Sequence, residues 1–282
     1  MFDRSTTLLA ALVVAGVAWP VHADGQSWRE ATMSHRLESS EPVRAQISYG
    51  AGTFGLRATE EPLLYRVSLR YDEDAYEPLI EYSGDRLEIG MEGSGRRFPF
   101  GRRSSGGSMD LELARGVPMD LDLHFGAVKA DVDLGGLALT SLELSTGASE
   151  SRIDVSEPNT SVLRRAVFEI GAADFTMRRL GNLGAERIEL KAGVGHVDLS
   201  LDGRWRADAR LSIEMGLGAL DLRVPEGLGI RIRKDSFLTS FDPEGLVKRG
   251  DSYYSLDWEE ADRKVTIDLN AAFGSVQVLW IR

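Results

Sequence analysis

The sequence predicts a mainly β protein, a parallel β-solenoid (β-helix-like) whose chain turns at glycine corners about every 22 residues. The first supporting observation is a glycine-centred segment that repeats at spacings of 21, 24, 22 and 23 residues. The glycines that mark these repeats are Gly126, Gly147, Gly171, Gly193 and Gly216, with Gly50 and Gly274 as outlying members across longer insertions. The second observation is a regular alternation of apolar and polar residues on both sides of each glycine.

This alternation predicts which side chains face the interior, because successive residues of a strand point to opposite faces. Around Gly193, the residues expected inside are Ile188, Leu190, Val197 and Leu199, whereas the charged residues between them should face solvent. Each repeat is therefore expected to be a strand, a glycine corner, a second strand and a loop. Stacking such rungs about 4.8 Å apart would bury one continuous apolar interior.

The corner glycines are expected either to adopt a positive φ or to lie where the backbone leaves no room for a Cβ. Counting from Gly274, the last repeat should point Phe273 and Trp280 inward. Charged residues at equivalent positions should stack with alternating sign, which supports parallel rungs. The expected neighbours are Glu169, Lys191 and Glu214, together with the pairs Asp131/Arg152 and Asp154/Arg178.

Residues 1–23 are predicted to be a signal peptide. Arg4 precedes an apolar run from Leu8 to Trp19, and the run ends near a small-residue cleavage pattern at Val21-His22-Ala23. A spanning helix needs about 20 apolar residues, so an uncleaved anchor is the alternative reading of this shorter run. The mature chain is expected to carry no transmembrane span and to be exported to the periplasm or cell envelope, or secreted.

The predicted domain organisation has three parts. After the signal peptide, residues 24–120 should form an N-terminal cap and the first strands, with a flexible basic loop at 91–108. Residues 121–282 should form the main solenoid domain, with an insertion at 234–262.

Composition argues against several functional classes. The net charge of -11 disfavours binding to nucleic acid through overall charge. The sequence contains no cysteine, so disulfides, thiolate metal sites and lipid attachment through cysteine have no support. Residues 50–55 spell G-x-G-x-x-G, the dinucleotide fingerprint, but no amphipathic helix pattern follows them. We therefore interpret these glycines as the first corner and expect no cofactor.

The best pair of carboxylates for an enzyme is Asp198 and Asp221, which should lie on adjacent rungs with His196 nearby. We interpret them as part of a solvated acidic face, although a shared proton or cation is the alternative. His124 should lie three rungs from His196, too far to share a metal. We therefore expect no catalytic or metal-binding residues and no enzymatic activity.

The predicted basic loop carries the candidate binding residues. Four arginines and two aromatic residues are concentrated there on an otherwise acidic protein, which suits anionic lipid, anionic glycan or an acidic partner. The alternative is a loop kept soluble by its charge. The candidate contact residues are Arg96, Arg97, Phe98, Phe100, Arg102 and Arg103.

Several stretches together resemble the bacterial toast-rack and LiaF-like envelope proteins, over roughly residues 40–282. The stretches are 134–155, 168–232, 241–255 and 264–278, and the more distinctive features are the RLGN sequence at 179–182, Trp205 and the GLVKRGDSYYS insertion. The resemblance implies an adhesin-like β-solenoid with no catalytic residues. Membrane-anchored LiaF relatives restrain a sensor kinase in envelope stress signalling, but this sequence lacks their multiple N-terminal spans.

The sequence thus predicts a non-catalytic exported envelope protein, an interaction or scaffold module linked to the envelope stress response. Its expected partners are an envelope protein or an anionic glycan or lipid, and the open C-terminal edge at Arg282 could support oligomerisation. Two alternatives stay open. The protein could be a surface adhesin that binds glycans, or a β-helix enzyme that cleaves polysaccharides.

Overall fold

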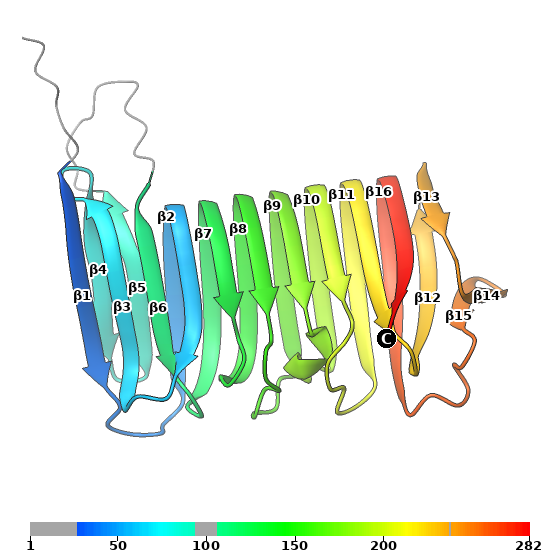
Figure 1. Ribbon diagram of the computed structural model, residues 1–282, viewed down its shortest axis with the longest axis horizontal. Coiled ribbons are helices and arrows are strands. Elements are labelled where there is room, and N and C mark those ends of the chain that lie inside the picture. The colour runs from blue at the N-terminus through cyan, green and yellow to red at the C-terminus, as the bar shows by residue number, and fades with distance from the viewer. Residues whose placement is uncertain (1–26, 94–105, 237) are drawn as a thin grey trace, which may run out of the picture.

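The computed structural model of the protein describes residues 27–93, 106–236 and 238–282, and these residues are mainly β, as the sequence predicts (Figure 1). Its strands form one 16-stranded sheet whose main path follows the order β1-β3-β6-β2-β7-β8-β9-β10-β11-β16-β12-β15-β14. Within the described ranges, no helix has the length and apolar character needed to cross a membrane.

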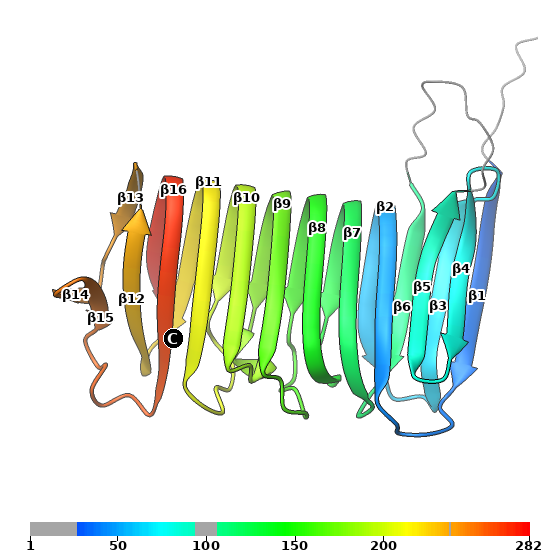
Figure 2. The same ribbon diagram turned by 180° about the vertical axis from the view of Figure 1, so that it is seen from behind.

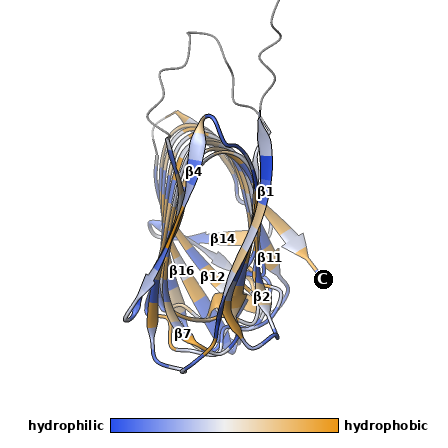
Figure 3. Ribbon diagram, turned by 90° about the vertical axis from the view of Figure 1, so that its left-hand side faces the viewer, coloured by the Kyte–Doolittle hydropathy of each residue, from blue (hydrophilic) through white to orange (hydrophobic). Residues whose placement is uncertain are grey.

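Seven long strands form the body of the sheet, and neighbouring members pair in parallel. Each strand curves over at its middle, so that its first half lies in one wall and its second half in the facing wall (Figure 3). We call these the first and second walls, and the bend between them the corner. The seven strands are β2 (Val43–Thr59), β7 (Pro118–Asp133), β8 (Ala138–Asp154), β9 (Arg165–Arg178), β10 (Arg187–Ser200), β11 (Ala209–Pro225) and β16 (Arg263–Ile281).

Shorter strands form the N-terminal end of the stack and extend each wall separately (Figure 2). The antiparallel hairpin of β4 (Tyr76–Ser83) and β5 (Arg86–Gly93) extends the first wall, because β5 pairs with the first half of β2. Three strands extend the second wall beside the other half of β2. They are β1 (Trp28–Arg36), β3 (Leu63–Asp72) and β6 (Ser108–Ala114).

At the C-terminal end, the last strand of the chain does not lie last in the sheet. Strand β16 inserts between β11 and β12 (Leu228–Ser236) and pairs in parallel with both. Three short strands complete this end, with β13 beside the second half of β16 and β15 beside β12. They are β13 (Thr239–Asp242), β14 (Leu246–Arg249) and β15 (Ser252–Ser255).

The core lies between the two walls and consists of the alternating apolar residues. Leu190 and Leu199 of β10 are each 1% exposed, and their neighbours on adjacent strands are equally buried. Full burial of a leucine side chain contributes about 1.5–3 kcal/mol, so each rung adds several such contributions to one shared interior. The predicted inward positions in the body of the stack are therefore confirmed.

The edge opposite the corner holds the loops between successive strands (Figures 1 and 2), and buried asparagines organise them. The Asn159 side chain accepts a hydrogen bond from the backbone nitrogen of Leu139 at 2.8 Å and donates to its carbonyl oxygen at 3.0 Å. Asn182, which lies within the 3-10 turn η1 (Leu180–Leu183), donates to the carbonyl oxygen of Val155. These bonds satisfy buried backbone groups where the sheet ladder ends.

The register of β16 differs from the sequence expectation. Gly274 pairs with Gly218, whereas the position opposite Gly216 is occupied by Ala272. The prediction that Phe273 points inward is therefore wrong, because its side chain is 46% exposed. Trp280 packs partly buried against the core, and Val276 and Val278 occupy the inward positions of the second wall.

Candidate functional site

The corner is lined by two columns of small residues, and crowding between strands explains the first. A Cβ on Gly216 would lie 2.5 Å from the carbonyl oxygen of Gly193, and one on Gly193 would lie 2.9 Å from that of Gly171. In the second column, two residues further along each strand, Gly218 has a φ of 150°. The backbone is consequently bare of side chains along the first column, where it faces outward.

The residue that follows the first glycine column is apolar and exposed on every long strand. The larger side chains among them are Val194 (51% exposed), Leu217 (52%) and Phe273 (46%), which pair with one another in register. Scattered apolar residues on a surface are ordinary, but a continuous row of them indicates a contact surface. We call this row the corner stripe, which consists of Ala51, Ala127, Ala148, Ala172, Val194, Leu217 and Phe273.

A groove runs along the first-wall side of the corner, across the strands from β8 to β12. Its volume is about 1220 Å³, and the backbones of the first glycine column lie along it. It crosses five strand-to-strand steps, and at about 4.8 Å a step this gives a length of about 24 Å. We call it the corner groove. The outward side chains along it are Ser145, Glu169, Lys191, Glu214, Asn270 and Asp235.

These polar side chains form a ladder two residues before the glycines, with the register that the sequence predicts for its first members. In the strand register, Lys191 lies opposite Glu169 on one neighbouring strand and Glu214 on the other. Its Nζ forms an ion pair with Glu169, at 3.2 Å from Oε1. Asn270 lies between Glu214 and Asp235 in the same way. Among the described residues, neither Glu214 nor Asp235 forms an ion pair, so the C-terminal half of the groove is acidic.

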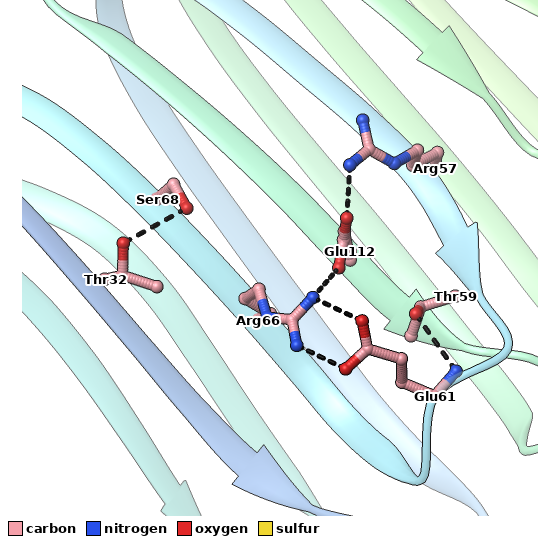
Figure 4. Close-up of polar contacts among 7 residues, drawn as sticks. All are labelled: Thr32, Arg57, Thr59, Glu61, Arg66, Ser68 and Glu112. Carbon is pink, nitrogen blue, oxygen red and sulfur yellow. Dashed lines mark hydrogen bonds and ion pairs between the residues drawn. The ribbon is translucent and has the colours of Figure 1, made fainter.

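A second hollow, of about 510 Å³, lies on the second wall near the N-terminal end, where Gly55 lacks a side chain. Figure 4 shows a chain of charged groups beside it, in which Glu112 binds both Arg57 and Arg66, and Arg66 also binds Glu61. The hydrogen bond from Arg66 lowers the pKa of the Glu61 carboxyl.

The charged chain links β2, β3, β6 and the turn before β3, and it leaves few of its groups free. Arg66 Nη1 lies 2.9 Å from Glu112 Oε2 and 2.8 Å from Glu61 Oε1. The contacts Thr32–Ser68 and Thr59–Glu61 shown in the same figure are likewise internal. Since its charges are engaged with one another, this cluster fastens the N-terminal strands together and is a poorer candidate for ligand binding than the corner groove.

The carboxylates singled out for possible catalysis do lie on adjacent strands, in register. Asp198, however, accepts two hydrogen bonds of 2.8 Å from the Arg223 guanidinium. Asp221 Oδ2 lies 3.2 Å from His196 Nε2, and Asp174 lies 3.6 Å from the other ring nitrogen of that histidine. Asp198 and Asp221 therefore have different partners, and among the residues described no three His, Cys, Asp or Glu side chains are arranged so that they could hold a metal ion.

Two expected charge pairs are neighbours in register but have other partners. Arg152 lies opposite Asp131, yet its guanidinium lies 2.6 Å from Glu150 Oε1. Asp154 lies opposite Arg178 but binds Arg179. A long arginine side chain reaches a neighbour on its own side of the pairing as easily as the residue opposite it on the next strand. The strand register alone therefore does not decide which ion pair forms.

His124 belongs to a short polar chain at the N-terminal end of the corner groove that the sequence did not reveal. Its Nδ1 lies 2.7 Å from Ser145 Oγ, and its Nε2 lies 2.9 Å from Asp122 Oδ2. Serine, histidine and aspartate in contact could suggest nucleophilic catalysis, which also requires donors for a developing oxyanion. The neighbouring strands pair their backbones in the ladder, so we interpret the three side chains as a hydrogen-bonded surface row.

The residues predicted to contact an anionic ligand lie outside the described part of the chain. Arg96, Arg97, Phe98, Phe100, Arg102 and Arg103 therefore stay a prediction. The signal peptide predicted for residues 1–23 also lies outside it.

Several solved structures are similar to this chain over most of its length. A candidate cell adhesion protein from Clostridium sporogenes ATCC 15579 is 15% identical, with 90% of this chain and 100% of that chain covered and a TM-score of 0.46. A candidate adhesin from Bacteroides fragilis NCTC 9343 is 9% identical, with 89% and 97% covered and a TM-score of 0.36. A candidate lipid binding protein from Parabacteroides distasonis ATCC 8503 is 10% identical, with 90% and 97% covered and a TM-score of 0.33.

With TM-scores below 0.5, these likenesses do not by themselves assign a fold or a function to this chain. No curated protein matches it. A family model described as the N-terminal domain of toast_rack, DUF2154, matches residues 23–178, which is more than half of the sequence. The chain therefore belongs to the toast-rack family.

Proposed function

We propose that this toast-rack protein is a non-catalytic, exported module of the cell envelope that binds a partner along its corner. The observation that carries the proposal is the corner stripe, in which Val194, Leu217 and Phe273 expose about half of their surface in one continuous row. Selection for solubility works against such a row, and exposed apolar patches mark binding surfaces. The corner groove lies directly beside it.

The proposal treats the body of the fold as a parallel β-solenoid with glycine corners. Parallel pairing from β2 to β16 and the close approach of glycine backbones at the corner support this description. A solenoid offers the same groups at each rung, and repeat proteins use such extended surfaces for binding. A scaffold or interaction role therefore fits the geometry better than a single compact active site.

Export and a link to the envelope stress response are further parts of the proposal. They rest on the apolar segment at Leu8–Trp19 and on the resemblance to LiaF-like proteins. Oligomerisation through the C-terminal edge is a separate part of the proposal. Strand β13 covers β16 only from Gly274 to Gln277, so the last residues of β16 have an open side in the described structure.

The corner can be tested with two matched double variants of the full chain. Val194→Ser with Leu217→Ser removes two exposed apolar groups of the stripe, whereas Val162→Ser with Leu256→Ser removes two apolar groups elsewhere that are even more exposed. Cells producing each tagged protein are crosslinked, and proteins attached to it are quantified by mass spectrometry. We expect the stripe variant to lose the wild-type partner and the control to retain it. Equal retention by both variants would contradict binding along the corner.

A further inference from the structure

The carboxylates of the corner groove recur at every second strand. Glu169 lies on β9, Glu214 on β11 and Asp235 on β12, with Lys191 and Asn270 on the strands between them. Two strand-to-strand steps of about 4.8 Å separate successive carboxylate positions by about 9.6 Å. Lys191 engages Glu169, whereas Glu214 and Asp235 form no ion pair with any residue that the structure describes.

This spacing suits one common conformation of an extended peptide. A polyproline II helix has three residues per turn and rises about 3.1 Å per residue, so residues i and i+3 lie about 9.3 Å apart on the same side. In a β-strand, residues on the same side are only about 6.6 Å apart. A polyproline II segment lying along the groove would thus present every third side chain to alternate strands.

The two sides of the groove define the chemistry of that segment. On the ladder side, Glu214 and Asp235 are exposed and would attract cations. On the corner side, Val194 and Leu217 offer apolar contacts, and the glycine backbones between the two sides let a ligand approach closely. The side chains of the stripe also become larger, from alanine to phenylalanine, in the same direction along the sheet as the groove becomes acidic.

We propose that the corner groove binds a basic segment of a partner protein in the polyproline II conformation, with Lys or Arg at every third residue and apolar residues between them. This inference rests on the proposed function and names the class of partner. Its basic residues meet Glu214 and Asp235, which line the groove. Its apolar residues lie against Val194 and Leu217, the exposed neighbours of the groove-lining glycines. Lys191 lies opposite the uncharged positions between two basic residues.

The groove suits other envelope ligands less well. Its unpaired carboxylates repel anionic lipid headgroups and anionic glycans over the roughly 8 Å Debye length of physiological salt. Sugar rings usually stack on exposed aromatic side chains, but Phe125, the aromatic residue among those described as lining the groove, is 5% exposed. The exposed Phe273 lies on the corner stripe, near the C-terminal end of the groove. A cationic peptide is therefore the occupant that charge and shape favour.

The probe for this proposal is a fluorescein-labelled peptide of four Arg-Pro-Leu repeats with both ends blocked. Its comparison peptide has the same composition, with the four arginines adjacent. Binding to the full chain is measured by fluorescence anisotropy over a series of salt concentrations. We expect the spaced peptide to bind more tightly than the clustered one, and binding to weaken as salt rises.

A matched pair of double variants separates recognition from general charge attraction. Glu214→Gln with Asp235→Asn should weaken binding of the spaced peptide by about threefold to tenfold, the range expected for two exposed ion pairs, and abolish the preference between peptides. Glu186→Gln with Glu226→Gln makes the same change in net charge at the opposite edge, and should leave binding unchanged. Equal weakening in both double variants, or equal binding of both peptides by the wild type, would overturn the proposal.

Failure of this inference can be told from failure of the proposed function. If the wild type binds neither peptide, while the stripe variant still loses its partner in cells, the ligand class is wrong and the corner remains the binding surface. If a neutral N-acetylglucosamine hexamer binds the wild type but not the stripe variant, the groove takes glycans and the peptide proposal is overturned. If the stripe variant also keeps its partner in cells, both proposals fail.

Discussion

Replacing Gly216 by alanine should weaken the stack at its corner. The new Cβ would lie 2.5 Å from the carbonyl oxygen of Gly193 on the neighbouring strand, and contacts below about 3.0 Å are not tolerated. The two backbones would have to part by at least about 0.5 Å, which corresponds to overpacking at a cost of about 1–3 kcal/mol. Ladder hydrogen bonds near the corner, worth about 0.5–1.5 kcal/mol each, would also weaken. Alanine also lowers the conformational entropy of the unfolded chain, which stabilises the folded state by about 0.4–1 kcal/mol. We therefore expect the free energy of unfolding to fall by about 1–3 kcal/mol in total.

Gly50 provides the matched control in the same glycine column. No atom lies within 4 Å of the Cβ that an alanine would add there, and its φ is not positive. Thermal unfolding of both variants is followed by circular dichroism, and urea titration gives the free energy of unfolding. We expect Gly216→Ala to lower Tm by about 3–10 °C and Gly50→Ala to leave it unchanged or slightly raised. Equal Tm values for the two variants would refute the explanation of the glycine column by backbone crowding.

Four further predictions concern the core, acid stability, export and the basic segment. Leu190→Asp should abolish cooperative unfolding because it buries a carboxylate at a position that is 1% exposed, whereas the exposed Lys191→Ala should change stability by less than about 1 kcal/mol in urea titration. The hydrogen bonds from Arg165 lower the pKa of the Glu189 carboxyl. The stability that they add is therefore present at neutral pH and is lost as pH falls through the folded-state pKa. Glu189→Gln should reduce the change in the free energy of unfolding between pH 7 and pH 3, measured by urea titration. Intact mass of the protein from the envelope fraction should correspond to a chain that begins at Asp24, and retention of Met1 would indicate an anchor instead. Joint replacement of Arg96, Arg97, Arg102 and Arg103 by serine should leave Tm unchanged and reduce salt-sensitive retention on anionic liposomes, whereas equal retention would exclude these residues as the anionic contact.

The body of the fold could be predicted because its repeats obey one simple rule. Inward residues such as Val197 and Leu220 alternate with polar ones on each strand, and the glycines fix where the alternation is counted from. The charge ladder of Glu169, Lys191 and Glu214 follows from the same count. These features depend on local periodicity alone, which a single sequence displays.

The features that could not be predicted depend on choices that periodicity leaves open. Glycine occurs in both columns, so the sequence alone allows Gly274 to belong to either one. The pairing of Leu217 with Phe273 places Gly274 in the second column. The position of β16 between β11 and β12 is likewise a matter of long-range pairing. A signal for the corner stripe was present, because Val194 and Leu217 directly follow corner glycines. The alternation of inward and outward residues is interrupted where a strand bends, so counting along the strand did not show that these two side chains are exposed.

Ion-pair partners were a second open choice. Arg152 could reach Asp131 on the neighbouring strand or Glu150 on its own, and Asp154 had two arginines within reach. Exposed ion pairs differ from one another by less than about 1 kcal/mol, so sequence spacing does not select among them. The same limit explains why Asp198 and Asp221 could be placed side by side without revealing that Arg223 and His196 hold them.

Site-resolved photo-crosslinking in intact cells tests binding along the corner most directly. A benzophenone amino acid is placed at Leu217 in the corner stripe and, in a second protein, at Val162, which is 72% exposed at the opposite edge. We expect a discrete crosslinked product from position 217 and none from position 162, with the attached peptide of the partner rich in Lys or Arg. Crosslinking of equal yield from both positions, or from position 162 alone, would contradict a binding surface at the corner.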